Sequence, residues 1–256
     1  MDINLLLLDV GHARVKLGVV EAGELVTSQR VALDQPENLA GAIEELWRRL
    51  DGKGAEVAGA ASNKPAGESV AAIVQKATGQ RPQWVGADLD VPIQVATREP
   101  GRTGVDRVLN VAAAYEQLKK ACVVIDAGSA VTVDFCDDSG KFLGGCIAPG
   151  AAAQSAALNT IAPHLPLIKV TATDAAYGDG TESAINCGIV NGLRGLVRHA
   201  VEQHAMTLDT WPEVIATGGD AAELFGGWEL VHAVSPDLTL YGIGHAYASH
   251  HVKHGT

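Results

Sequence analysis

The chain has 256 residues, a formal net charge of −11 and an isoelectric point of about 5.2. Hydrophobic residues make up 47% and charged residues 19%, which supports a sizeable core and argues against intrinsic disorder. The acidic balance argues against a general surface for nucleic acid or anionic membranes, although backbone N–H groups and a few cations can still bind phosphates locally.

The N-terminal sequence does not have the pattern of a signal peptide. Asp2 stands where a signal peptide is basic, and the apolar run that follows is only four leucines. No stretch approaches the ~20 apolar residues of a membrane helix. The cysteines form no Cys-x-x-Cys pair, so we expect them to be reduced and mostly buried. They are Cys122, Cys136, Cys146 and Cys187. We expect a soluble, cytoplasmic protein.

The first half of the chain predicts three strands and then alternating helices and strands. A glycine turn separates the first two strands, and apolar residues three and four apart indicate the first helix. Residues 86–103 predict a loop. The predicted strands are 5–9, 15–20, 24–33, 56–62 and 82–85, and the predicted helices are 36–50, 68–78 and 105–119.

The same order restarts at Cys122. Each half therefore predicts three antiparallel strands followed by alternating helices and strands, which gives a mixed sheet with helices on its faces. We place the boundary near residue 118, with domains at 1–118 and 119–256. The predicted strands of this half lie within 122–135 and at 142–147, 213–216 and 230–234, and the predicted helices are 151–160, 184–204, one from 221, and 241–250.

One short phrase occurs twice, half a chain apart. Apolar residues precede Asp9 and Asp126, and Gly11 and Gly128 follow two positions later. Glycine lets the backbone approach a ligand closely, so two such turns across a cleft would present N–H groups to a polyphosphate. The two carboxylates would hold cations, and Lys16 would neutralise phosphate charge. Taken singly, each phrase is more often only a turn.

Two further motifs have both a functional and a structural interpretation. Thr217-Gly218-Gly219-Asp220 lies between a predicted strand and a predicted helix, where a base or ribose could pack, or it is only a capped helix start. His250-His251-x-x-His254 is either a metal site or a solvated helix end. The chain contains no His-Glu-x-x-His, P-loop or Gly-x-Gly-x-x-Gly motif.

In order and spacing, these motifs resemble type III pantothenate kinase, of the acetate and sugar kinase, heat-shock chaperone and actin superfamily. The resemblance covers nearly the whole chain, and its most specific parts are Gly-x-Asp-Arg at 104–107 and Asp-x-Gly-Ser-Ala-x-Thr at 126–132. It implies an α/β fold of two ribonuclease-H-like (actin-like ATPase) domains, each a mixed sheet flanked by helices, and a homodimer. It also implies ATP-dependent phosphorylation of pantothenate to 4′-phosphopantothenate, the first step of coenzyme A synthesis, with Mg-ATP and K⁺ or NH₄⁺.

The resemblance also assigns roles to residues. Asp106 matches the general base and Asp126 the ligand of the monovalent cation. The substrate residues are Thr97, Gly104, Val105, Arg107 and Thr181, with the Arg107 guanidinium suited to the pantothenate carboxylate. The ATP-binding residues are Asp9, Val10, Gly11, His12, Ala13, Lys16, Gly128, Ser129, Thr132, Gly218 and Gly219.

Each of the main roles has a structural alternative. Asp106 would be a carboxylate favoured by the dipole at a helix N-terminus, and Arg107 part of a surface salt bridge. Thr181 would be a helix cap. Asp126 would be satisfied by neighbouring backbone N–H groups instead of a cation.

The chain departs from the family pattern at two places. His12 and Ala13 stand where the family has asparagine and threonine or serine, so a hydroxyl that could donate to phosphate is lost. Such a bond is worth about 1.5–3 kcal/mol, or ~10- to 100-fold in ATP affinity. A protonated His12 would replace part of it. Thr97 takes the place of a tyrosine, which weakens the case for a substrate contact there.

Two other functions stay open. A non-catalytic family member would bind nucleotide or pantothenate weakly in a regulatory role. A kinase of the same superfamily would act on another hydroxyl or carboxylate, although residues 104–107 argue against it.

Overall fold

The computed structural model describes residues 3–255 and divides into two compact units. Unit 1 comprises Met1–Gln94, Glu99–Ala113 and Asp237–Thr256. Unit 2 comprises Val95–Arg98 and Ala114–Pro236. Each unit has its own sheet and its own hydrophobic core, so the two are described separately.

Unit 1 contains a five-stranded mixed sheet in the order β3-β2-β1-β4-β5. Strand β2 is antiparallel to both β1 and β3, whereas β4 and β5 run parallel to β1. Successive side chains of a strand point to opposite faces of the sheet, so residues two apart lie on the same face. The strands are β1 (Leu5–Val10), β2 (Arg14–Glu21), β3 (Glu24–Ala32), β4 (Glu56–Ala61) and β5 (Gln83–Trp84).

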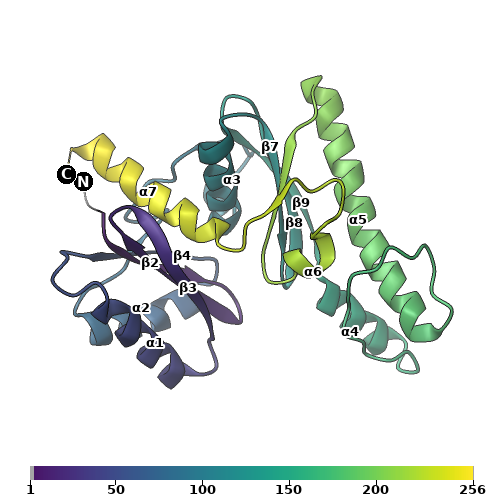
Figure 1. Cartoon of the computed structure of the whole chain (residues 1–256), viewed down its shortest axis with the longest axis horizontal. Coiled ribbons are helices and arrows are strands. Elements are labelled where there is room, and N and C mark those ends of the chain that lie inside the picture. Colours follow the sequence, from purple (N-terminus) through teal and green to yellow (C-terminus); the bar gives the residue numbers. More distant parts are fainter. Residues whose placement is uncertain (1–2, 256) are drawn as a thin grey trace. The chain divides into compact units, whose positions relative to one another are not determined.

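Helices cover both faces of this sheet. On one face, Leu6 and Leu8 pack with Leu39 of α1 (Pro36–Arg48) and Val70 of α2 (Lys64–Thr78). On the other, Leu5 and Leu7 pack with α3 (Val105–Leu118) and α7 (Leu238–His254) through Leu109 and Leu240. Figure 1 shows α7, in yellow, running along the purple strands of the N-terminal sheet.

Unit 2 repeats the architecture of unit 1. Its strands β9-β8-β7-β10-β11 have the order and directions of β3-β2-β1-β4-β5, and β6 adds an edge strand next to β9. The strands are β6 (Gln94–Val95), β7 (Cys122–Ala127), β8 (Ala130–Cys136), β9 (Lys141–Pro149), β10 (Glu213–Thr217) and β11 (Ala233–Val234). The helices are α4 (Ala151–Ile161), α5 (Thr181–Leu208) and α6 (Ala221–Phe225).

The predicted α/β fold with two mixed sheets flanked by helices is confirmed. Some boundaries are corrected. Helix α2 begins four residues before the predicted 68, because the Asn63 side chain accepts the Ala66 N–H at 3.2 Å and proline is tolerated in a first turn. The predicted loop 86–103 contains β6 and a 3₁₀ turn at Pro100–Arg102, and the last strand is only Ala233–Val234.

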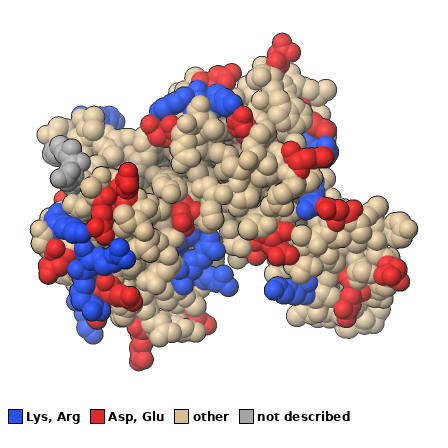
Figure 2. All heavy atoms as spheres, viewed as in Figure 1, with Lys and Arg blue, Asp and Glu red and all other residues tan. Residues whose placement is uncertain are grey.

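The contact-based units are discontinuous. Helix α7 belongs to unit 1, because Leu240, Ile243 and Ala246 pack into the core that contains Leu5 and Leu7. The continuous domains 1–118 and 119–256 stay a prediction. Among the described residues, no helix is long and apolar enough to span a membrane. All four cysteines are free, and three are buried, as expected. Basic side chains lie among acidic ones on the face shown in Figure 2.

Candidate functional site

Asp9 and Asp126 occupy equivalent places in the two sheets. Each is the fifth residue of a six-residue strand, β1 or β7, and the two strands have the same burial pattern: buried everywhere except at the aspartate. Each aspartate lies two residues before the glycine of the turn to the next strand. The repeated phrase in the sequence therefore corresponds to a repeated structure.

In unit 1, Asp9 faces the side of the sheet on which α3 and α7 lie. Side chains alternate along a strand, so Asp9 points to the same side as Leu5 and Leu7. Those two leucines pack in the core shared with α3 and α7. The carboxylate thus lies at the carboxyl end of β1, on the face where these two helices pack.

Lys16 stands directly opposite Asp9 in the β1–β2 pair and therefore shares its face. Its residue is only 8% exposed, and its Nζ lies 3.7 Å from Oδ1 of Asp237. Asp237 is the N-cap position of α7, and its Oδ2 accepts the Ser28 hydroxyl at 2.9 Å. A buried ammonium held between two strands and a helix start is suited to attract phosphate, and Asp237 tethers it.

The turn between β1 and β2 places His12 and Ala13 at the surface. The Gly11 N–H donates to the Arg14 carbonyl at 3.0 Å, and a Cβ on Gly11 would lie 3.3 Å from that oxygen. The Gly11 N–H is therefore used within the turn, while the two residues that depart from the family pattern are exposed. In the corresponding turn of unit 2, the Gly128 N–H donates to the Ala130 carbonyl at 3.0 Å.

Asp106 lies in the first turn of α3 and folds back on its own helix end. Its Oδ1 accepts the Arg107 N–H at 2.9 Å. A Cβ on Gly104 would lie 2.7 Å from the same oxygen, so glycine is what leaves room for the carboxylate. The aspartate is half-buried in the first turn of the helix, close to the N-terminal end of the helix dipole. The structural alternative for Asp106 is thus present, and it is compatible with a role as base.

In unit 2, Asp126 has polar neighbours on both adjacent strands. Its register partners are Thr132 on β8 and Thr217 on β10, which share its face of the sheet. The Thr132 hydroxyl donates to Oδ2 of Asp134 at 2.9 Å, and Asp134 is 1% exposed. The Thr217 hydroxyl is fully buried and has no hydrogen-bond partner within residues 3–255. A buried hydroxyl without a partner beside a carboxylate is a costly arrangement that a ligand would relieve.

The glycine turn after β10 packs tightly on the end of β7. A Cβ on Gly218 would lie 2.5 Å from Oδ1 of Asp126 and 2.3 Å from the Ala127 carbonyl, and the backbone there has φ of +100°. The Asp220 N–H donates to the same carbonyl at 2.9 Å. Only glycine fits at position 218. The turn is therefore attached to the aspartate's strand and is more than a helix start.

The remaining substrate residues lie in unit 2. Thr97 follows β6, and its Cγ2 would lie 3.7 Å from a Cβ on Gly144. Thr181 is exposed at the start of α5 and lines a cavity of about 690 Å³ between α4 and α5. The alternative that Thr181 is the helix cap is wrong, because Gly180 is the N-cap residue.

The predicted site residues are divided between the two units. Unit 1 contains the first turn, Lys16 and residues 104–107, and unit 2 contains Asp126, Ser129, Thr132 and the glycines at 218 and 219. The sequence interpretation missed Asp134, Thr217 and Asp237 as site residues. Thr217 stands inside the Thr217-Gly218-Gly219-Asp220 motif, but only the strand register shows that it adjoins Asp126. Asp237 is linked to Lys16 only by tertiary structure.

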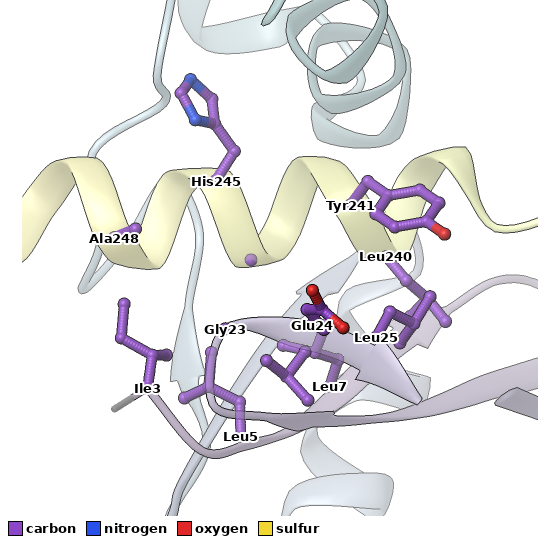
Figure 3. Close-up of a pocket in the computed structure, with 12 residues that line it drawn as sticks. Ile3, Leu5, Leu7, Gly23, Glu24, Leu25, Leu240, Tyr241, His245 and Ala248 are labelled. Atoms are coloured by element: carbon purple, nitrogen blue, oxygen red, sulfur yellow. The ribbon is translucent and has the colours of Figure 1, made fainter. Parts of the chain in front are cut away.

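Unit 1 also has a cavity that holds none of the predicted site residues. It has a volume of about 500 Å³ and lies between α7 and the strands. Figure 3 shows its lining, which is mostly apolar, with Leu5, Leu7 and Leu240 between helix and strands and with Glu24 near its edge. The Asp-x-Gly turn of this unit is thus separate from the cavity.

The repeated strand order and the repeated aspartate turn define a duplicated α/β protein with one mixed sheet in each unit. The family model for type III pantothenate kinase matches residues 5–203. The chain belongs to the type III pantothenate kinase family.

Similar proteins agree with this assignment. A type III pantothenate kinase from Desulfatibacillum aliphaticivorans is 31% identical over 93% of this chain and 96% of its own length. One from Dehalococcoides mccartyi strain CBDB1 is 30% identical over 95% of each chain. Among solved structures, a Campylobacter jejuni protein assigned to the Baf family of transcriptional activators has a TM-score of 0.61 at 20% identity over 98% of both chains, which supports the fold alone.

Proposed function

We propose that this protein transfers the γ-phosphoryl group of ATP to the hydroxyl of pantothenate and forms 4′-phosphopantothenate. One observation carries the proposal. An aspartate precedes a glycine turn at the end of β1 and again at the end of β7, the equivalent strand of the second sheet. The chain that contains this repeat belongs to the type III pantothenate kinase family.

Phosphoryl transfer depends mainly on positioning and charge neutralisation. Lys16, buried and tethered by Asp237, supplies positive charge for the ATP phosphates. Asp106 takes the proton of the attacking hydroxyl, and the Arg107 guanidinium binds the pantothenate carboxylate. The backbone of Gly104 and Val105 positions the substrate. Asp9, Val10, Gly11, His12 and Ala13 act on the ATP side in unit 1, and Gly128, Ser129, Thr132, Gly218 and Gly219 in unit 2.

The residues around Asp126 fit a monovalent cation. K⁺ and NH₄⁺ are met by oxygen atoms, and the site offers the Asp126 carboxylate and the Thr217 hydroxyl that lacks a partner within the described chain. When bound, such an ion supplies positive charge near the phosphates of ATP. Magnesium comes with ATP, and the carboxylates are ligands of the kind it prefers.

We also propose that two copies associate through α4 and α5. Ile161 is 83% exposed and lines the cavity between these helices, together with Leu158 and Thr181. An apolar patch of this kind marks an interaction surface. Sedimentation of Ile161→Glu should then give a monomer where the wild type gives a dimer. The cytoplasmic location stays a prediction.

A coupled ATP assay with pantothenate, run with and without K⁺ and at ATP concentrations up to several millimolar, tests the proposal. We expect phosphopantothenate to form in a K⁺-dependent way. Asp106→Asn should lower kcat by ~10²- to 10⁴-fold, the range of general-base catalysis, while the thermal midpoint stays unchanged. No product at any ATP concentration would favour the non-catalytic alternative, and product only from sugars or acetate would favour a different kinase.

A further inference from the structure

Three potential metal ligands from two distant parts of unit 1 lie together at the end of α7. Asp90 belongs to the segment after β5, and His250 and His254 are one helical turn apart on α7. Their ligand atoms all lie within 4.8 Å of one another. We call Asp90, His250 and His254 the α7 histidine cluster. Histidines four residues apart share one face of a helix, so the helix itself aligns two of the donors.

The separations are close to those of a bound metal. Oδ2 of Asp90 lies 3.8 Å from Nδ1 of His250 and 3.5 Å from Nε2 of His254. Ligands about 2.0–2.1 Å from a tetrahedral zinc ion lie about 3.3 Å apart. The two ring centroids are 4.4 Å apart. Small side-chain rotations would therefore bring the three donors, which all lie within 4.8 Å of one another, onto one ion.

Nδ1 of His250 faces the Asp90 segment. It accepts the backbone N–H of Asp90 at 3.3 Å. A long hydrogen bond of this kind is weak and is readily exchanged for a metal bond. His250 is the most buried of the three side chains, at 23% exposed, and it lines a cavity of about 250 Å³ with Asp90.

The electrostatic surroundings favour a cation. The cluster lies in the last turns of α7, at the negative end of the helix dipole. Lys253 already places its ammonium 2.9 Å from Oδ2 of Asp90. A metal ion would have to displace this ammonium, which makes Lys253 a built-in competitor.

The neighbouring His251 is engaged elsewhere. Its Nδ1 donates to the Tyr247 carbonyl at 2.9 Å, and its ring stacks on the Tyr247 ring with centroids 4.2 Å apart. It is not one of the three clustered donors. The same helix therefore offers a matched control for the two histidines that are.

We propose that the α7 histidine cluster binds a zinc-class transition metal ion, with two imidazole nitrogens and one carboxylate oxygen as ligands and water completing the coordination. Imidazole and carboxylate together suit zinc and cobalt. The bound ion joins the segment around Asp90 to the C-terminal end of α7. Because only the folded chain brings these donors together, binding stabilises unit 1.

Zn²⁺ titration of the untagged full-length chain by calorimetry tests the proposal, and Co²⁺ absorption reports the ligand geometry. We expect one saturable site and a Zn²⁺-dependent rise in thermal midpoint. His250→Ala, His254→Ala and Asp90→Asn should each weaken Zn²⁺ binding by more than about tenfold. Removing a residue that only hydrogen-bonds a metal ligand already weakens binding by about that much, and loss of a ligand should have at least the same effect. His251→Ala should bind like the wild type.

Lys253→Ala gives a test in the opposite direction. It should bind Zn²⁺ more tightly, because the competing ammonium is gone, and its metal-free thermal midpoint shows whether the helix end is intact. Absence of saturable binding by the wild type would overturn the proposal. So would equal Zn²⁺ affinity in the wild type, His250→Ala and His254→Ala, or weaker binding by Lys253→Ala.

Discussion

The Lys16 ammonium lies 3.7 Å from the Asp237 carboxylate, so a strand residue near the beginning of the chain is paired with the helix start near its end. Lys16 is 8% exposed and shares the sheet face of Asp9. The Asp237 carboxylate orients the lysine beside the first aspartate turn. The pair therefore connects the position of α7 to the phosphate side of the proposed site.

Asp237→Asn should lower the free energy of unfolding by about 1–2 kcal/mol, because the buried Lys16 ammonium loses its ion-pair partner and the Ser28 hydroxyl donates to a neutral group instead of a carboxylate, while Asp237 is itself partly exposed. It should also raise the KM for ATP, because Lys16 is held less firmly. Urea unfolding and initial rates measure the two effects. Asp34→Asn, an exposed carboxylate of the same unit, is the control and should change neither.

Gly104→Ala should lower kcat by about 10²-fold with little change in stability. Its Cβ would come within 2.7 Å of Oδ1 of Asp106, and a displacement of about 1 Å at a reacting group has an effect of this size. Gly101→Ala is the matched control, because its Cβ meets nothing within 4 Å. Equal kcat values for the two variants would show that the orientation of Asp106 does not matter.

Thr217→Val should leave the free energy of unfolding unchanged, or raise it by up to about 1 kcal/mol, in K⁺-free buffer. The substitution removes a buried hydroxyl that lacks a hydrogen-bond partner in the described part of the chain, and such a group is costly to bury. Activation by K⁺ should weaken, because an oxygen beside Asp126 is lost. Chemical unfolding and a K⁺ titration of the rate measure the two changes.

The control for Thr217 is Thr239→Val. Thr239 is also buried, but its hydroxyl donates to Asn110 at 2.8 Å, so the same substitution should destabilise the protein by about 1–2 kcal/mol. If Thr217→Val proved as destabilising as Thr239→Val, the hydroxyl of Thr217 would have a partner after all.

Ala13→Thr should lower the KM for ATP by ~10- to 100-fold, because it restores a hydroxyl that can donate to a phosphate. Ala13 is exposed in the turn after β1, so the larger side chain meets little steric resistance. The KM for pantothenate should stay the same. Ala87→Thr, in an exposed turn of the same unit, controls for the added side chain, and an equal ATP response in both variants would contradict the role of position 13.

His204 should make the stability of the protein fall in mild acid. Burial against Phe135 lowers the pKa of its imidazole below the usual 6.5, while the Cys136 backbone and the carboxylates of Asp137 and Asp138 act in the other direction. Below pH 6.5 the unfolded chain therefore binds more protons at His204 than the folded protein does. The contribution of the neutral His204 to the free energy of unfolding is complete above pH 6.5 and is lost as the pH falls.

Urea unfolding between pH 5 and 8 measures this contribution. His204→Gln should flatten the pH dependence below 6.5, because the group whose pKa differs between the two states is removed. His199→Gln, an exposed histidine on the same helix, should keep the slope of the wild type. A slope that survives in His204→Gln would assign the pH dependence to other groups.

The local features of the sequence predicted most of the fold. Apolar alternation, glycine turns and helical spacing indicated three strands and alternating helices and strands in each half, and both sheets have that order. The first residue of α2 was missed because Pro65 and Gly67 suggest a loop, although the cap at Asn63 starts the helix before them. The packing of α7 on unit 1 depends on contacts between the two ends of the chain, which no local pattern encodes.

In the proposed site, too, some residues could be predicted from local sequence and others only from tertiary structure. Asp9 and Asp126 could be named from the phrase that recurs in the sequence, whereas Asp106 was named from the resemblance of residues 104–107 to the family. Asp237 could be linked to Lys16 only through tertiary structure, and Thr217 to Asp126 only through the register of β7 and β10. The two histidines of the α7 histidine cluster could be read from the sequence, but the third ligand could not. Asp90 lies 160 residues before His250, and only folding brings the two together.

The return of α7 to unit 1 has a consequence for synthesis of the protein on the ribosome. The apolar face of the N-terminal sheet that contains Leu5 and Leu7 is covered only in part, by α3, until the segment from Asp237 onward has been translated. Unit 2 is nearly continuous in sequence and has all its strands by residue 234, so it can fold while the nascent chain still holds the rest. The part of the protein that is made first is thus completed last.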